Sequence, residues 1–478
     1  MRVGKRQVIS AVEYYSKRFE SRTTEELRSI AHVKRFLELF TMDSGFRQAL
    51  VAPSGNGQTI VDPRGLDVDL SLLARFRKDE KCLPDEQGGG AGFPLMEMWR
   101  KWIRDLRAFR SLAREDGYSD VAGSRFNAWR KRQVERVNSE FGDTKGDAIV
   151  HPIFCFELSK GCSMGCWFCA FGAEPLKGVF KRTRENSRLW REILQVAVDL
   201  FGIAAQTGFC YGATEPYDNP HYLDFVEDFR EIVGVLPQTT SAAPVKDLQW
   251  TRRLIEMQRR PPAKPSRFSI LSLGALRKLH DAFTPEELLR FELLPQNKES
   301  ITAKARAGRT LEKADDPESK HRGLRIAGNA GSIACVSGFQ VNMVDRSIEL
   351  ISPCAASDRR PLGYRVHVAG TFENAQDFGD FIERAIADHM PTTLPDDRPV
   401  AFRPDLTAGP VENGFALRSA FKTHTCSGSP HIRFLGWLIA QGKHTPARIL
   451  NILTEHGADI FSVRSTLQDL FDKGLLEE

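Results

Sequence analysis

Three cysteines lie within eight residues of one another, in the run Cys162-Ser-Met-Gly-Cys166-Trp-Phe-Cys169. Cysteine thiolates hold iron–sulfur clusters, and a fully ligated cubane normally takes four of them. Three thiolates without a nearby fourth leave one iron open to a substrate or cofactor, which is the arrangement that a catalytic metal needs. The spacing therefore indicates an open iron–sulfur cluster.

A zinc site of the Cys3His kind is the alternative for the same spacing. It needs a histidine close by, and histidines are scarce here, because His151 precedes the predicted strand and the next one is His221. The number of cysteines is odd, which favours metal or redox chemistry over a disulfide framework. The nine cysteines stand at positions 82, 155, 162, 166, 169, 210, 335, 354 and 426.

The composition excludes several classes of protein. With 41% hydrophobic and 27% charged residues over 478 positions, the chain suits one catalytic-size domain with smaller appendages, and global disorder is excluded. The net charge of +5 is too small over this length to make nucleic acid the expected partner. The sequence has no run of about 18 apolar residues and no secretory signal, so we expect a cytoplasmic protein without a membrane partner.

Short apolar runs alternate with helical patterns from about residue 150 onward. The runs predict strands at 154–159, 207–213, 236–243, 267–273 and 291–296, and amphipathic helices follow the first four. Strand and helix in repeated alternation build a parallel sheet whose ligand site lies at the carboxyl ends of the strands. The pattern predicts an α/β core over 151–330, arranged as a partial or full βα barrel, with the cysteine triplet directly after the first strand.

Segments of different composition flank this predicted core. Residues 1–150 are predicted to be helical, and one helix in FPLMEMWRKWIRDLRAFRSLARE places Trp99, Trp102, Ile103 and Leu106 on one face. Residues 298–325 are charged and are predicted to form a solvated helix or a mobile loop. Over 331–390, the runs FQVNMV and SIELISP predict a β-hairpin with Cys335 before it and Cys354 after it. Residues 391–412 are rich in Pro and Asp and are predicted to be a linker.

The last segment, 413–478, contains three short amphipathic helical patterns separated by Gly or Pro. The arrangement is typical of a small helix-turn-helix or winged-helix module. Its candidate recognition helix, SVRSTLQDLFDKG, has only Arg464 and Lys473 as cations, so nucleic acid is not the expected ligand. Binding of a leader peptide and simple packing against the rest of the chain both stay open.

The spacing CxxxCxxC with Phe168 before the last cysteine resembles the signature of radical S-adenosylmethionine enzymes. The resemblance implies a partial (β/α)6 barrel of the TIM-like radical S-adenosylmethionine type. It implies that Cys162, Cys166 and Cys169 bind a [4Fe-4S] cluster, whose fourth iron is chelated by the amine and carboxylate of S-adenosylmethionine. Electron transfer to the sulfonium then yields a 5′-deoxyadenosyl radical.

A second segment is similar to the GGEP-type motif with which this family contacts the methionine moiety. It is Tyr211-Gly212-Ala213-Thr214-Glu215-Pro216 at the end of the second predicted strand, and it departs from the motif by having Ala213-Thr214 in place of the second glycine. Gly212 would let the backbone approach the cofactor, and Glu215 would accept from its ammonium group. The family often places hydroxyl groups at later strand ends, which here implies Thr240, Ser241, Ser269 and Ser272.

A finer resemblance covers most of the chain. The stretches FELSKGCSMGCWFCAFGAEP, SIACVSGFQVNMVDRSIELISPCAASDRRPLGYRV and RFNAWRKRQVERV resemble the radical enzymes that epimerise residues in ribosomally made peptides of proteusin-type pathways. The resemblance implies conversion of L-residues to D-residues in a precursor peptide that carries a leader. It also implies a low-potential electron donor, such as a flavodoxin or ferredoxin.

Such an inversion has its own residue requirement. Abstraction of a Cα hydrogen leaves a planar radical, and inversion then requires a hydrogen atom from the opposite face, which a cysteine thiol can supply. The donor must stay a neutral thiol, so apolar burial that raises its pKa is favourable. Cys354 in ISPCAAS fits this description, and Cys335 in SIACVSG is the second candidate; an inert buried cysteine is the alternative for each.

Two other functions remain in view. A radical peptide cyclase or thioether-forming enzyme would use Cys335, Cys354 and Cys426 as ligands of an auxiliary iron–sulfur cluster, although three scattered cysteines fall short of the preferred four. A non-enzymatic iron–sulfur carrier would use four local cysteines, and an iron–sulfur sensor would need a basic recognition helix. Cleavage of S-adenosylmethionine under reduction separates the enzymes from the carrier and the sensor.

Overall fold

The computed structural model describes residues 9–51, 66–68, 94–314 and 325–478, so Cys82 lies outside the described residues. The N-terminal part is helical, as the apolar periodicity predicts. Capping side chains fix two of its starts, because Ser10 accepts from the N–H of Glu13 and Thr23 forms a reciprocal capping box with Glu26. The helices are α1 (Ala11–Glu20), α2 (Thr24–Met42), α3 (Ser44–Val51), α6 (Pro94–Glu115), α7 (Gly123–Phe141) and α8 (Asp143–Gly146).

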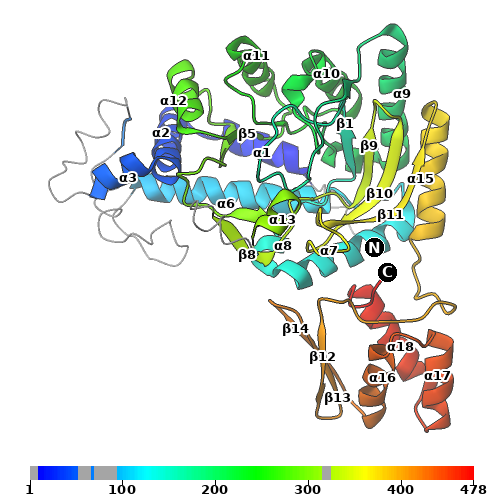
Figure 1. Cartoon of the computed structure of the whole chain (residues 1–478). Coiled ribbons are helices and arrows are strands. Elements are labelled where there is room, and N and C mark those ends of the chain that lie inside the picture. Colours follow the sequence, from blue (N-terminus) through cyan, green and yellow to red (C-terminus); the bar gives the residue numbers. More distant parts are fainter. Residues whose placement is uncertain (1–8, 52–65, 69–93, 315–324) are drawn as a thin grey trace, which may run out of the picture.

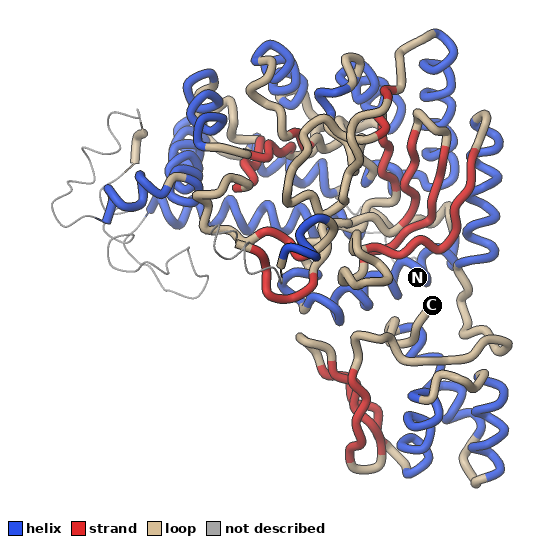
Figure 2. The backbone as a smooth tube through the Cα atoms, viewed as in Figure 1, coloured by secondary structure: helices blue, strands red, loops and turns tan. Residues whose placement is uncertain are grey.

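A four-stranded sheet in the order β1-β9-β10-β11 follows. Its strands are β1 (Phe154–Glu157), β9 (Gly338–Asn342), β10 (Ser347–Pro353) and β11 (Tyr364–Thr371). Strands β1 and β9 are parallel, whereas β9 and β10 form the antiparallel hairpin that the sequence predicts, with Ile348 opposite Val341. Helix α15 (Ala375–His389) packs against β11 and runs along the outer side of this sheet (Figure 2).

Further parallel segments follow on the other side of β1. Two backbone hydrogen bonds join β1 to Phe209, and a three-stranded parallel sheet in the order β4-β5-β6 lies farther along. Its strands are β4 (Thr240–Ser241), β5 (Ser266–Ile270) and β6 (Phe291–Pro295). The intervening helices are α9 (Arg184–Phe201), α10 (Tyr222–Val233), α11 (Leu248–Gln258) and α12 (Leu273–Ala282), which succeed one another along one side of the molecule in Figure 1.

The chain is thus a mixed α/β protein with several small sheets. The second predicted strand, 207–213, is present only as an isolated bridge between Cys155 and Phe209, and the third shortens to β4. A barrel stays a prediction, because the parallel pieces belong to separate sheets in the described residues.

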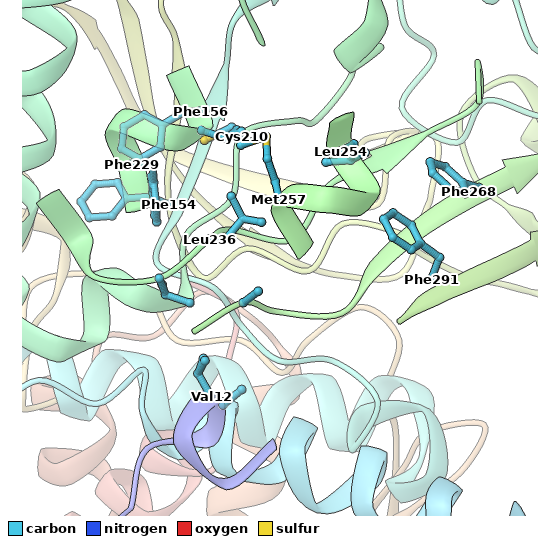
Figure 3. Packing of buried hydrophobic residues seen from close by; sticks show 14 of the residues in the cluster. Val12, Phe154, Phe156, Cys210, Phe229, Leu236, Leu254, Met257, Phe268 and Phe291 are labelled. Atoms are coloured by element: carbon cyan, nitrogen blue, oxygen red, sulfur yellow. The ribbon is translucent and has the colours of Figure 1, made fainter. Parts of the chain in front are cut away.

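One large hydrophobic core joins the helices and the strands. Phe154 and Phe156 of β1 stack with ring centroids 5.2 Å apart, and Phe268 of β5 stacks on Phe291 of β6 at 4.6 Å. Figure 3 shows these two groups of rings, with Cys210 beside the first and Leu254 between them. The same core reaches α1 and α6. The N-terminal helices therefore share one hydrophobic core with the strands and do not form a separate domain.

The charged segment 298–325 differs from its prediction. Its described part contains a strand, β7 (Lys304–Arg306), and a helix, α13 (Arg309–Lys313), and β7 pairs with β8 (Ile326–Ala330). Lys304 is buried and donates to the carbonyl of Pro295, and Thr310 is fully buried. The prediction was wrong for these residues because charged side chains that reach backbone carbonyls can be buried.

The C-terminal module has its own hydrophobic core and lies apart at the bottom of Figure 1. It comprises a three-stranded antiparallel sheet followed by three helices. The elements are β12 (Thr407–Val411), β13 (Gly414–Arg418), β14 (Thr423–Ser427), α16 (Pro430–Ala440), α17 (Pro446–Glu455) and α18 (Ile460–Asp472).

Two predictions about this module need correction. The linker prediction 391–412 is too long, because Val400 and Leu406 belong to the module's core and β12 begins at Thr407. The module is not purely helical. It contains a sheet, and Phe415 and Leu417 of β13 pack in one core with the three helices. The sequence did not predict this sheet, because β12 and β14 contain no buried residue and no run of large apolar side chains. Across the described residues, none of the helices is both long and apolar enough to cross a membrane.

Candidate functional site

The cysteine triplet lies on a closed loop directly after β1. Strands β2 (Ser159–Lys160) and β3 (Gly178–Val179) pair at its base, and the N–H of Cys162 donates to the carbonyl of Glu174 at 2.9 Å. Gly161 has a φ of +79°, and a Cβ there would lie 2.3 Å from the carbonyl oxygen of Pro175. Only glycine fits this turn, so the base of the loop is fixed by backbone geometry.

The three thiols are half-buried on this loop. Cys166 lies close enough to Cys162 and to Cys169 for their charges to interact. Burial raises the pKa of the Cys162 thiol to about 11 and raises the pKa of Cys166, so their thiolates need a compensating cation. Among the described side chains, no three His, Cys, Asp or Glu are gathered tightly enough to enclose a metal, and the triplet is a loop of neighbouring donors.

Two of the sulfur atoms accept backbone hydrogen bonds. The N–H of Met164 lies 3.4 Å from Sγ of Cys162, and the N–H of Ala173 lies 3.4 Å from Sγ of Cys169. Hydrogen bonds of this kind stabilise cluster thiolates and tune the cluster potential. The donor set and its N–H environment therefore fit an iron–sulfur cluster.

Asp218 attaches the loop to the YGATEP segment. Its two carboxylate oxygens accept from the N–H of Ser163 at 2.8 Å and from the hydroxyl of Ser163 at 2.6 Å. Lys246 also donates to the Ser163 hydroxyl, at 3.3 Å. The two motifs recognised in the sequence thus meet in space, and the contact lies one residue after the first cysteine.

Arg309 of α13 attaches the other end of the loop. Its guanidinium donates to the carbonyl of Cys166 at 2.8 Å and to the carbonyl of Ala173, and its backbone N–H donates to the carbonyl of Cys169 at 3.0 Å. Gly308 precedes it at a φ of +53°, where a Cβ would lie 2.3 Å from the carbonyl oxygen of Ala170. Sequence reasoning missed Arg309, because it lies in the charged segment and no motif marks it.

Phe168, predicted to contact the cofactor, lies among cationic side chains of the same segment. Lys304 lies 5.6 Å from the centre of its ring, and the ring of Trp167 meets it edge-on at 5.5 Å. Burial lowers the pKa of Lys304 to about 8. The aromatic pair and the basic segment together cover one side of the cysteine loop.

Glu157, the last residue of β1, organises the YGATEP segment. Its Oε1 accepts from the N–H of Ala213 at 2.8 Å, and Gln340 and Asn342 of β9 donate to the same carboxylate. A Cβ on Gly212 would lie 2.5 Å from Oε1 of Glu157, so the close neighbour that requires glycine is this carboxylate. Burial raises the pKa of Glu157, and the hydrogen bonds oppose that shift. The sequence contained no signal for this role beyond a lone acid on a buried strand.

Glu215 is buried and already has three partners. It accepts from the hydroxyl of Ser241 at 2.5 Å, from the N–H of Ala242 at 2.7 Å and from the N–H of Tyr217 at 3.1 Å. Burial raises its pKa to about 6. Glu215 also lies close enough to Cys162 for their charges to interact, so it binds the segment after β4 to the region of the triplet.

The remaining predicted positions differ from one another. Thr214 is half-buried, Pro216 begins a short 3-10 turn (Pro216–Asp218), and Thr240 of β4 lies beside Tyr211. Ser269 is half-buried on β5. Ser272 lies beyond the strand, where its hydroxyl caps α12 by accepting from the N–H of Ala275, so its prediction as a strand residue was wrong.

Cys354 lies just after β10 and is 1% exposed. Its N–H donates to the carbonyl of Gly363 at 3.0 Å, which closes the segment 354–363 into a loop. Ala356 of this loop packs in one small cluster with Ala170 and Ala307, and Ala170 follows Cys169. Burial raises the pKa of the Cys354 thiol to about 11, so the thiol keeps its proton.

The Cys354 loop rests on a buried ion cluster. Glu140 of α7 accepts from the N–H of Ala355 at 2.6 Å, and Arg136, Arg365 and Arg403 surround the same carboxylate at 3.4, 3.0 and 3.7 Å. Arg136 also pairs with Glu477 at 3.1 Å, and Arg132 pairs with Glu478 at 2.8 Å. The end of the C-terminal module is thereby joined to α7 and to the loop that follows Cys354.

Cys335 occupies a different environment. It packs in a small cluster with Cys155, Phe209, Val336 and Tyr211, on the inner side of β1. Burial raises its pKa to about 11, and the nearby guanidinium of Arg267 opposes the shift. Cys155 donates to the carbonyl of Tyr211 at 2.7 Å, and Cys335 packs in the same cluster as Tyr211, so Cys335 lies beside the segment that leads into YGATEP.

Comparison with known proteins finds a long match and a short one. The chain is 38% identical over 467 residues to "Uncharacterized protein y4wI" of Sinorhizobium fredii (strain NBRC 101917 / NGR234), and the match covers 98% of this chain and 91% of that protein. Residues 400–474 match the family described as "Protein y4wI C-terminal domain", which coincides with the module of β12–β14 and α16–α18. No solved structure matches the chain.

Proposed function

The chain belongs to the y4wI family, and we propose that it is a radical S-adenosylmethionine enzyme that epimerises residues of a ribosomally made precursor peptide. The expected cofactors are a [4Fe-4S] cluster on Cys162, Cys166 and Cys169 and one S-adenosylmethionine. The expected partners are the precursor with its leader and a low-potential flavodoxin or ferredoxin. The reaction converts L-residues to D-residues.

One observation carries the proposal. The cysteine loop is held by segments that the resemblance assigns to separate roles, because Asp218 of the YGATEP region binds Ser163 and Ala356 of the Cys354 loop packs on Ala170. Asp218 and Ala356, about 140 positions apart in the sequence, thus contact one loop of thiols. This convergence is what an enzyme needs if it generates a radical at one point and quenches the product beside it.

The cluster and S-adenosylmethionine, when bound, would supply the adenosyl radical that abstracts the Cα hydrogen. The chain's own residues position the loop and return a hydrogen atom. Asp218 and Arg309 hold the loop through its backbone, and Glu157 holds the YGATEP segment. A thiol S–H then gives a hydrogen atom to the planar Cα radical from the opposite face, which leaves a thiyl radical that the electron donor must reduce.

Both candidate thiols meet the chemical requirement of staying protonated. Cys354 has its pKa raised to about 11, and so has Cys335. Cys354 is favoured because its loop contacts the cysteine loop through Ala356, whereas Cys335 packs in a separate cluster with Tyr211 and Phe209.

A radical cyclase with an auxiliary cluster is the second candidate, and the surroundings of its cysteines oppose it. Cys335 lies near Arg267, Cys354 lies near Arg365 and Glu140, and Cys426 lies near Lys473 in the C-terminal module. These three neighbourhoods share no residue, so the three thiols have no common ligand position. Leader binding by the C-terminal module stays a prediction; its β14 lies at a sheet edge, where a peptide can add as a strand.

Two measurements test the proposal. Reconstituted protein under reduction should cleave S-adenosylmethionine to 5′-deoxyadenosine, and Cys162→Ala, Cys166→Ala and Cys169→Ala should each abolish cleavage. Co-expression with a neighbouring precursor in deuterated water should place one deuterium on each altered residue. Cys354→Ala should abolish this labelling and leave cleavage intact, whereas Cys426→Ala, which lies in the C-terminal module, should change neither.

Other outcomes reject specific parts of the proposal. If the Cys→Ala variants of the triplet still cleave S-adenosylmethionine, the proposed radical mechanism is wrong. If deuterium labelling persists in Cys354→Ala and is lost in Cys335→Ala, Cys335 is the hydrogen-atom donor. If the product is cross-linked and contains no deuterium, the enzyme is a radical cyclase and not an epimerase.

A further inference from the structure

A cavity of about 450 Å³ lies between the N-terminal helices and the strands β5 and β6. Its walls come from α1, α2 and α6 on one side and from β5, β6 and the segments before them on the other. Figure 1 shows α6 running lengthwise beneath these strands. The volume falls in the range of sites that bind ligands, and the triplet cysteines do not line it.

The apolar wall of the cavity is the face of α6 that the sequence pattern singles out. Trp99, Trp102, Ile103 and Leu106 all line it, although their spacing predicts only packing against a core. Trp102 is 3% exposed and is held by Phe19 and Tyr15, with ring centroids 5.9 and 6.3 Å away. The aromatic wall is therefore fixed in place before any ligand arrives.

The polar part of the wall carries an excess of positive charge. Six cationic side chains line the cavity (Lys34, Arg107, Arg110, Lys264, Arg267 and Arg290) against two acidic ones, Glu38 and Glu292. Glu292 is shared by Arg110 at 3.5 Å and Arg267 at 3.1 Å, and Glu38 already pairs with Lys34 and His280. The wall thus favours an anionic group on the ligand.

Two buried hydrogen-bond donors of this wall have no acceptor among the residues that the structure describes. They are the hydroxyl of Tyr15, on a side chain that is 3% exposed, and Nη1 of Arg290. The two groups are close enough for their charges to interact, and Arg290 is held 3.8 Å above the ring of Phe19. Burial raises the pKa of Tyr15 to about 12, so its hydroxyl keeps the proton that it would donate. Both atoms are closed to solvent. Arg290 as a whole is only half-buried and lines the cavity, so a ligand there would contact the remaining nitrogens of its guanidinium.

The cavity connects the surface with the region of the candidate site. Arg107 and Glu292 of its lining are exposed, and Cys335 belongs to the same lining. Tyr211, the first residue of YGATEP, also lines it, and the Tyr211 hydroxyl donates to Gln238 at 2.8 Å. A ligand in the cavity would therefore extend toward the segment that Glu157 positions.

We infer that this cavity binds an acidic, apolar segment of the substrate peptide, with the carboxylate at the guanidinium of Arg290 and the apolar side chains along α6. The inference rests on the proposed function only in taking the ligand to be a peptide. The geometry assigns the chemistry of that segment, which is a Glu or Asp flanked by large aliphatic residues.

Binding to the full chain, without S-adenosylmethionine or reductant, tests this assignment. The probe is a fluorescein-labelled peptide, Leu-Glu-Leu-Leu, and the matched probe is Leu-Lys-Leu-Leu, both measured by fluorescence anisotropy. The acidic probe should bind at least about ten-fold more tightly, because a charge-assisted pair with a buried guanidinium has that strength. Equal affinity of the two probes would overturn the assignment, as would direct binding of decanoate combined with no binding of the acidic peptide.

Variants locate the binding in the cavity. Arg290→Met should weaken the acidic probe by at least about ten-fold, whereas Arg259→Met, at an exposed arginine that does not line the cavity, should leave the affinity within about two-fold. Leu106→Trp fills the cavity without removing a charge, and it should abolish binding while the circular dichroism spectrum stays unchanged. Full affinity in a folded Leu106→Trp protein would overturn the assignment even if Arg290→Met failed to fold.

The outcome is separable from that of the proposed function. Binding of the acidic peptide to a protein that cannot form 5′-deoxyadenosine would reject the radical reaction and support the cavity assignment. Formation of 5′-deoxyadenosine without selective peptide binding would reject the cavity assignment alone.

Discussion

The cysteine loop and the ion cluster under the C-terminal module are both polar sites, but their polar groups have different partners. In the loop, Asp218 and Arg309 bind mainly backbone atoms and leave the three thiols without side-chain partners. In the ion cluster, Glu140, Glu477 and Glu478 are matched against Arg132, Arg136, Arg365 and Arg403.

We interpret this difference as that between a loop proposed to bind a ligand and a cluster that holds the fold together. Backbone hydrogen bonds fix the shape of the loop and leave its donor atoms available for a metal. The carboxylates and guanidiniums of the ion cluster pair with one another and hold three distant parts of the chain together. We therefore expect changes in the ion cluster to lower the stability of the apoprotein, and changes in the loop to lower cofactor retention at nearly constant stability.

The largest effect on stability is expected for Glu140→Ala. The substitution leaves buried Arg136, Arg365 and Arg403 around a missing carboxylate and removes the acceptor of the Ala355 N–H. Removal of one partner from a buried ion pair typically costs about 3–5 kcal/mol, because the remaining charge is uncompensated. Denaturant unfolding of the apoprotein measures the loss.

Lys131→Ala is the control for this variant, because Lys131 lies on the same helix and is exposed. Its free energy of unfolding should stay within about 0.5 kcal/mol of that of the parent protein. A Glu140→Ala protein as stable as the Lys131→Ala protein would show that the ion cluster does not hold the fold together.

A smaller, pH-dependent effect is expected for Glu478→Gln. Burial opposes ionisation of Glu478, but Arg136, Arg132 and His367 prevail and lower its pKa to about 2 from the usual 4.5. A carboxyl group whose pKa is lowered by folding stabilises the protein above its unfolded pKa, and this contribution disappears as the pH falls through the folded pKa. Glutamine should therefore cost up to about 3 kcal/mol at pH 7 and progressively less from pH 4.5 toward pH 2.

Unfolding curves at pH 7, 5, 4 and 3 measure this trend. Glu455→Gln is the matched control, since Glu455 is exposed at the end of α17. A difference between Glu478→Gln and the parent protein that stays constant over this pH range would contradict the assigned ion pairs.

The sequence predicts the local part of the candidate site and not the long-range part. The triplet follows a recognisable strand, and YGATEP follows a second apolar run, so both motifs can be placed from neighbouring residues. Arg309 and Glu157 could not be assigned roles, because their partners lie in other elements and neither occurs in a motif.

The ion cluster fails to appear in the sequence for a further reason. Helix α7 contains Arg130, Arg132 and Arg136, all buried, although charged residues usually mark the solvent face of a helix. Their partners include Glu477 and Glu478, more than 300 positions away. The prediction that residues 1–150 are helical covers α7 but cannot reveal a polar interface. The β12–β14 sheet is missed for a similar reason, because its edge strands are largely exposed.

The smallest effect on stability, and the sharpest test of the comparison, is expected for Asp218→Ala. Asp218 contacts the loop through partly exposed hydrogen bonds to Ser163, which contribute about 1 kcal/mol or less to folding. The free energy of unfolding should therefore barely change, while the reconstituted cluster should lose iron to a chelator several-fold faster. Asp224 of α10 is half-buried and its ion pairs are no shorter than 3.8 Å, so Asp224→Asn should match the parent protein in both measurements. An Asp218→Ala protein that loses stability and keeps its iron would reverse the assignment, because the loop would then serve the fold and not the ligand.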